Sequence, residues 1–251
     1  MGGVFISEGM GLRIPAGGLT IGVGDDGKLT SSITFEVALD VWPMWLDVAL
    51  DHAVQAAQVR LELEAAVRAA GETGLEGKDQ AALMTAECQA GMVSIAAAAF
   101  ALDNFYSAVR RFVPGSAALE AQWAQANTAR NRRISESLRR TFRVTNDGAK
   151  NLRGSVGEIF RFRDWAVHPP ADFRAPLKHD LLDSGVEWRF VAFRASNAVR
   201  ATGAATAIIF QCIDAPRVGN DELMNWCSSR KSRIEPRMAR ARYELREYEE
   251  G

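Results

Sequence analysis

The stretch WPMWLDVALDHAVQAAQVRLELEAAVRAA, residues 42–70, decides the fold class of this chain. It is rich in alanine, leucine, glutamate and glutamine, which favour helix, and Pro43 suits a first helical turn. The three glycines of GETGLEGK, residues 71–78, end this helical run. Similar runs predict further helices at about 79–113, 116–143, 149–167, 193–213 and 221–248. The sequence therefore predicts a mainly α protein in which residues 42–251 form a helical bundle.

The first 41 residues have a different pattern. In ITFEVALDV, residues 33–41, apolar side chains recur at every second position, which is typical of a half-buried strand. Upstream, LTIGVG and KLTSS flank DDGK, where Asp26 and Gly27 suit a tight hairpin turn. A further strand is expected near residues 12–14. The sequence thus predicts a small N-terminal β-hairpin appendage over residues 1–41 and a helical domain over 42–251.

Composition indicates a soluble, cytoplasmic protein. Of the 251 residues, 47% are hydrophobic and 24% are charged, which is ordinary for a globular domain. The longest apolar run, near residues 91–102, is too short to span a bilayer, and no signal peptide is recognisable. His52 and His179 lack acid or cysteine neighbours at metal-ligand spacing. We expect no cofactor and no metal, and no disulfide framework from the scattered cysteines Cys88, Cys212 and Cys227.

Positive charge is concentrated in the middle of the chain, although the net charge is only −1. Residues 130–163 contain ten basic and three acidic side chains, and a second basic run covers 230–242. Solvated helix faces would explain this pattern, and so would a surface for a polyanion. The guanidinium fork suits phosphate. The candidate RNA-binding residues are Arg130, Arg132, Arg133, Arg139, Arg140 and Arg143.

The helix expected at 149–167 carries an arginine where its pattern calls for an apolar residue. Leu152, Val156, Ile159 and Arg163 are spaced by four, three and four, so they share one stripe of a helix. A desolvated guanidinium is costly unless it is paired. A structural ion pair, for example with Asp103, would explain Arg163, and so would a functional site.

A histidine follows at the end of the same helix. Asp164 and His168 are spaced i and i+4, so they share one side of the helix if it extends that far. Pro169 disfavours helical geometry at His168, and the helix is therefore expected to end there. An unwound His168 could then turn toward Arg163.

The segment Arg163-Asp164-Trp165-Ala166-Val167-His168 resembles the signature of the HEPN superfamily, which is arginine, a polar residue, three residues and histidine. Its expected place at the end of a helix in an all-helical bundle agrees with that family. The resemblance implies a HEPN-like fold for residues 42–248. It also implies a metal-independent endoribonuclease, or an RNA-binding module, that acts as a homodimer with one composite cleft.

The resemblance implies a role for each motif residue. His168 would transfer protons to and from the RNA 2′-hydroxyl and the leaving oxygen. Arg163 would hold the scissile phosphate and stabilise its developing charge. Asp164 would orient one of them, at a position where many family members have asparagine. We expect RNA as substrate and a cognate antitoxin or defence partner.

Two other functions stay open from the sequence. Several HEPN proteins have lost catalysis, so the chain could be a non-catalytic binding or dimerisation module of the same fold. It could also bind duplex DNA through the helix that carries residues 130–143.

Overall fold

Helices make up most of the chain that the structure describes, as the sequence predicts. The structure is a computed structural model and describes residues 10–14, 17–24, 26–73, 78–142, 144–168, 175–182, 184–217 and 219–248. The chain divides into two units, Met1–Val41 and Trp42–Gly251. The first contains short antiparallel strands and the second contains the helices.

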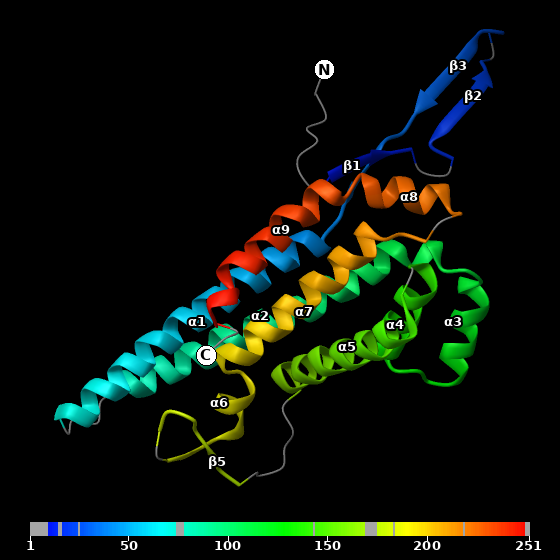
Figure 1. Ribbon diagram of the computed structural model, residues 1–251. Helices are drawn as coiled ribbons and strands as arrows, with labels where there is room; N and C mark the ends of the chain where they lie inside the picture. Colours follow the sequence, from blue (N-terminus) through cyan, green and yellow to red (C-terminus); the bar gives the residue numbers. More distant parts are fainter. Residues whose placement is uncertain are drawn as a thin grey trace. The chain divides into compact units, whose positions relative to one another are not determined.

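Three long helices form the centre of the helical unit (Figure 1). Helices α1 (Trp42–Thr73) and α2 (Lys78–Val109) pack along each other, and α7 (Ala195–Asp214) packs against both. The buried hydroxyl of Ser94 on α2 joins all three. Its Oγ donates to the Ala49 carbonyl oxygen of α1 at 2.9 Å and lies 2.8 Å from Thr202 Oγ1 of α7.

The remaining helices surround this centre. Helix α5 packs against α2 and α4, and α9 packs against α1 and α7. Their bounds are η1 (Arg110–Phe112), α3 (Ser116–Gln125), α4 (Arg130–Thr141), α5 (Asn146–Val167), α6 (Trp188–Ala192), α8 (Asp221–Ser228), α9 (Lys231–Glu244) and η2 (Arg246–Tyr248). Two short strands, β5 (Leu177–Lys178) and β6 (Gly185–Val186), pair before α6.

An aromatic cluster fills one end of the core. The buried ring of Phe105 on α2 lies 5.7 Å from Trp42 of α1, centroid to centroid, in an edge-on arrangement. It also lies 6.0 Å from both Phe142, which follows α4, and Trp226 of α8. Aromatic pairs at these distances add to the free energy gained by burying their area. Phe105 thus links the end of α2 to three other parts of the unit.

Two of the expected helices are divided, one into two helices and the other into three. The run 116–143 forms α3 and α4, because Asn127 has a left-handed φ of 46° and Ala129 is extended. Arg133 stabilises this break by donating to the carbonyl oxygens of Thr128 and Trp123. The run 221–248 forms α8, α9 and η2. Helix α5 begins three residues before the expected residue 149: Thr145 is its N-cap and accepts from the Gly148 N–H at 3.1 Å.

Helix α2 is apolar because it lies in the core. The segment Asp79–Phe112 reaches a mean hydropathy of 1.4, enough by length and composition for a membrane span. More than half of that stretch is buried inside the helical unit, and α1, α5 and α7 pack against it. A core helix of a soluble protein has this combination of hydropathy and burial.

The N-terminal unit contains the predicted hairpin. Strands β2 (Leu19–Val23) and β3 (Leu29–Ile33) pair antiparallel, and Gly27 takes a left-handed φ of 75° in the turn. Strands β1 (Met10–Arg13) and β4 (Glu36–Leu39) form a second antiparallel pair.

The prediction of one half-buried strand at 33–41 is wrong, because the chain changes its pairing partner between β3 and β4. The side chains of Phe35, Val37 and Leu39 are exposed at 53%, 47% and 50%. Alternation therefore predicted extended backbone correctly and burial incorrectly.

The close packing of α2 against the segment before α7 can be tested at Gly91. A Cβ at this position would lie 1.9 Å from the Phe193 carbonyl oxygen, so backbone would have to move. We expect Gly91→Ala to lower the free energy of unfolding by about 3 kcal/mol, measured by urea denaturation.

Gly154→Ala is the matched control, since a Cβ at this position of α5 meets no other atom within 4 Å. It should raise stability by about 0.5–1 kcal/mol, because alanine is the better helix former. Equal stability of Gly91→Ala and wild type would contradict the close approach.

Candidate functional site at the end of α5

The helix that carries Arg163 ends where the sequence predicts. The last α5 residue is Val167, and His168 is its C-cap with φ −129° and ψ 72°. The His168 N–H donates to the Asp164 carbonyl oxygen at 2.7 Å. The imidazole of His168 is exposed, and no hydrogen bond or ion pair joins it to Arg163 in the described chain.

Arg163 lies on the buried stripe of α5, as its spacing predicts. Leu152, Val156 and Ile159 are buried, whereas the Arg163 side chain is 26% exposed. Its guanidinium carbon lies 4.8 Å from the centroid of the Phe160 ring. Arg163 is therefore half-buried at the exposed end of an otherwise apolar stripe.

The guanidinium of Arg163 is only partly satisfied. Its Nη2 forms an ion pair of 2.6 Å with Asp164 Oδ1, and the Asp164 side chain is 57% exposed. Its Nε is buried and makes no hydrogen bond with any residue that the structure describes. A buried donor without a partner is costly, so this atom marks Arg163 as a residue that needs an explanation.

The prediction that Asp103 pairs with Arg163 is wrong. The Asp103 Oδ1 atom accepts from Arg130 Nε at 2.6 Å, and the Arg130 guanidinium also stacks on Tyr106, 4.6 Å from the ring centroid. Arg130 reaches Asp103 because α4 begins at Arg130, and the sequence carries no clear signal for that helix start.

Most of the candidate RNA-binding arginines on α4 have partners in the protein. Arg130 pairs with Asp103, and Arg133 bonds two carbonyl oxygens. Arg139 and Arg140 both pair with Glu136 at 2.7 Å, and the hydrogen bond from Arg139 is the main reason that the pKa of Glu136 is lowered to about 2. Only Arg132 has an exposed guanidinium without a partner in the described chain, and Arg143 lies outside the described residues.

The basic run also extends away from the motif. Helices α4 and α5 follow each other as a hairpin, and Gly157 of α5 lies level with Asn131 at the start of α4. Arg139 and Arg140 therefore lie toward the start of α5. Asn146 and Arg163 are separated by 17 residues, or about 26 Å along the axis. Arg139 and Arg140 therefore do not share one surface with the end of α5.

The second basic run is likewise engaged. Arg237 on α9 pairs with Asp47 of α1 at 2.6 Å, Arg240 pairs with Asp51 at 2.7 Å, and Lys231 pairs with Asp214 at 2.8 Å. These contacts attach α9 to α1 and to the end of α7. This run therefore contributes to packing between helices.

A cavity among α5, α7 and α9 does not contain the motif. It has a volume of about 680 Å³. Glu158 and Phe162 line it from α5. At about 100° per residue, this side of α5 is roughly opposite to Asp164. The motif therefore lies outside this cavity, with Asp164 and His168 exposed and Arg163 half-buried.

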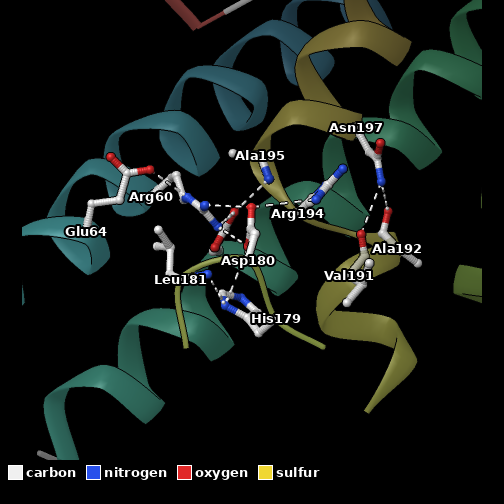
Figure 2. Close-up of polar contacts among 11 residues, drawn as sticks. Arg60, Glu64, His179, Asp180, Leu181, Val191, Ala192, Arg194, Ala195 and Asn197 are labelled. Carbon is white, nitrogen blue, oxygen red and sulfur yellow. Dashed lines mark hydrogen bonds and ion pairs between the residues drawn. The ribbon is translucent and has the colours of Figure 1, made fainter. Parts of the chain in front are cut away.

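A second polar cluster, which the sequence reasoning missed, lies at the start of α7 (Figure 2). Arg60 on α1 donates to both carboxylate oxygens of Asp180, at 3.1 and 2.7 Å, and to Glu64 at 2.8 Å. Arg194 lies 3.6 Å from Asp180. The Glu87 side chain, 3% exposed, accepts from the Ala195 N–H at 2.8 Å and so satisfies the first turn of α7.

This second cluster holds the fold together. The buried His179 accepts from the Leu181 N–H through Nδ1, and burial lowers its pKa. No group of three or more histidine, cysteine, aspartate or glutamate side chains in the described chain could hold a metal ion. The carboxylates of this cluster pair with arginines or cap α7, so the cluster attaches residues 179–181 to α1. The sequence signal for this cluster was Glu87, an acidic residue in the stretch AECQAG.

Comparisons of this chain with family models, curated proteins and solved structures give no match. The HEPN resemblance therefore stays a prediction.

The buried carboxyl of Glu87 should make stability depend on pH. Desolvation raises its pKa, against the hydrogen bond from Ala195 and the charge of Arg60. Because the pKa of Glu87 is higher in the folded state than in the unfolded chain, the protonated carboxyl favours the folded state at low pH. This stabilisation is lost as the pH rises through the folded-state pKa. Glu87→Gln keeps an acceptor for Ala195 and cannot ionise. We expect its stability relative to wild type to increase as the pH rises above about 4.5, where the unfolded carboxyl ionises.

Urea unfolding at several pH values measures this difference. Glu62→Gln, at an exposed position of α1, controls for the loss of one charge. A constant offset between Glu87→Gln and wild type across the pH range would show that Glu87 titrates in the folded state as it does in the unfolded chain.

Proposed function

We propose that the end of α5 is a phosphate-binding site and that two copies of the chain form a metal-independent endoribonuclease. The observation that carries the proposal is the half-buried guanidinium of Arg163, which has a buried Nε without a partner in the described chain. An arginine that is followed five residues later by an exposed histidine suits RNA phosphate. The exposed position at a helix end leaves room for a second copy.

The chemistry follows from the residue types. The RNA 2′-oxygen attacks the adjacent phosphorus, and His168 of one copy accepts the 2′-hydroxyl proton. The bond to the 5′-oxygen breaks, and His168 of the second copy donates a proton to that oxygen. Arg163 stabilises the negative charge that develops on the phosphate. The products are a 2′,3′-cyclic phosphate and a 5′-hydroxyl, and DNA is excluded as a substrate because it lacks the nucleophile.

Asp164 limits this site in the free protein. Its carboxylate already neutralises Arg163 at 2.6 Å, so RNA phosphate has to displace it. Because Asp164 is exposed, the ion pair is weak and such displacement is feasible. The proposed activity would harm a cell without control, which suits a toxin–antitoxin or defence setting with a cognate partner.

A second candidate function is a non-catalytic helical binding module. The observation that favours it is the existing Arg163–Asp164 ion pair together with the stacking of Arg163 on Phe160. In that case Arg163 stabilises the end of α5 and RNA is not cleaved. The proposal of duplex DNA binding through α4 is weaker, because Glu136 and Asp103 already pair with its arginines.

Cleavage of RNA in the presence of chelator tests the proposal. Wild type should produce cyclic-phosphate ends, and Arg163→Ala and His168→Ala should each lower the rate at least about 100-fold, because each removes a catalytic group. Arg153→Ala, an exposed arginine on the same helix, should cut like wild type.

The non-catalytic function gives a different result. No RNA would be cut, and Arg163→Ala would lower the melting temperature while His168→Ala would not. Cleavage that is equally fast in all four proteins would trace to a contaminant and would refute the ribonuclease proposal.

The role of Asp164 has its own test. Asp164→Asn removes the carboxylate that competes with phosphate and leaves an amide of the same shape. We expect it to strengthen binding of single-stranded RNA about 3- to 10-fold, measured by fluorescence anisotropy with the His168→Ala background to prevent cleavage. Glu158→Gln, which removes an exposed acid elsewhere on α5, is the control. Equal effects of the two substitutions would mean that only net charge changed.

A further inference from the structure

An open groove runs along α7 on the side of α5 that faces away from Asp164. The cavity of about 680 Å³ occupies one part of it. A second cavity of about 490 Å³ continues along α5 and α7 toward residue 215. Both are lined by Ser155, Ala204 and Ala207, so they are two parts of one groove. It belongs entirely to the helical unit and includes none of the residues assigned to RNA.

The floor of the groove is made of small residues. Ala201, Gly203, Ala204 and Ala207 of α7 line it, and Ile159, Phe162, Met238 and Leu245 form its walls. Alanine and glycine on a helix surface allow another backbone to come close. In the second cavity the apolar lining continues through Leu152, Ile208 and Cys212. The shape and the lining fit an elongated apolar body.

Charge is present at one end only. Arg200, Arg242 and Arg246 are exposed on the rim of the first cavity. Among the described residues that line it, the one acid is Glu158, which lies 3.7 Å from Arg161. The second cavity is lined by no charged residue. An occupant that matches the groove therefore carries negative charge at one end and an apolar stripe along its length.

The dimensions favour a helix as the occupant. From Asn197 of α7 to Ala215, which follows α7, the groove extends over 18 residue steps, about 27 Å. A helix of that length and about 10 Å width that is buried to half its depth fills roughly 1,000 Å³. The two cavities together have about that volume, which is much more than a single acyl chain needs. Helices α5 and α9, both packed against α7, would flank such a helix.

We infer that this groove binds an amphipathic helix of a partner protein, with carboxylate side chains at the end that lies against Arg200, Arg242 and Arg246. The apolar stripe of the partner covers Ala201, Ala204 and Ala207, and its backbone comes close to α7. This mode is the binding of a helix in a hydrophobic groove, with a charge pattern that sets its direction. The inference is independent of the ribonuclease proposal.

The test uses a fluorescein-labelled peptide of about 18 residues with leucine and alanine at helical spacing and three glutamates at one end. A second peptide has lysines in place of the glutamates. The full-length protein should bind the glutamate peptide at least about tenfold more tightly, measured by anisotropy. Ala204→Trp fills the groove and should abolish binding. Arg200→Glu combined with Arg242→Glu should reverse the preference between the peptides, and Arg153→Glu, outside the groove, should change nothing.

Each other outcome overturns the inference. Binding of neither peptide, or equal binding of both, excludes a helix with an acidic end. A dansyl-labelled undecanoic acid that binds in place of the peptides, and is blocked by Ala204→Trp, assigns the groove to a small amphiphile. A wild-type dimer that Ala204→Trp dissociates assigns it to a second copy. If Ala204→Trp does not fold, the arginine variants still decide the test, because their substitutions are on the exposed rim of the groove. RNA cleavage by the same variants is measured in parallel, so failure of one proposal is visible apart from the other.

Discussion

Close approach of other segments to α2 is the constraint on which the helical unit depends. At Gly91 the carbonyl oxygen of Phe193 occupies the space of a side chain, and one turn later Ser94 bonds to α1 and α7 at once. Further along, the buried alanines Ala97, Ala98 and Ala101 continue this small surface. Because these residues are small, neighbouring helices can pack at short distance, and dispersion contacts are gained along the whole length of α2. The position of α5, and with it of Arg163, depends on this packing.

The two polar clusters differ in what their ion pairs connect. Asp180 pairs with Arg60 of α1 and lies 3.6 Å from Arg194, and Glu87 caps α7, so this cluster holds distant segments of the fold together. At the end of α5, Arg163 pairs with its chain neighbour Asp164, which is exposed. Both clusters contain an arginine with a buried Nε that has no hydrogen bond in the described chain, Arg194 in the first and Arg163 in the second. The difference therefore lies in the partners, because the Arg163–Asp164 pair joins no second element of the fold.

Local signals were sufficient for the order of the elements. Residues 42–70 and 149–167 became helices because their residues have high helix propensity and their apolar positions have helical spacing. The same reasoning could not place the break at Asn127, since the side chains that stabilise it, such as Arg133, bond carbonyl oxygens brought near by the fold. It also could not detect that the apolar strand residues Phe35 and Val37 are exposed, because period-two alternation reports backbone geometry and not what covers the face.

The sequence by itself determined that this is a mainly α protein, that α5 ends at His168, and that Arg163 lies on a buried stripe. Each of these follows from propensity, proline geometry or helical period, which act over a few residues. Only the tertiary structure decided which charges meet. Asp103 pairs with Arg130 and not with Arg163, Glu136 takes up Arg139 and Arg140, and the groove along α7 forms from three helices that are distant in sequence. Ion pairs and cavities depend on distances of a few ångströms between such segments, and those distances are set by the packing of the whole helical unit.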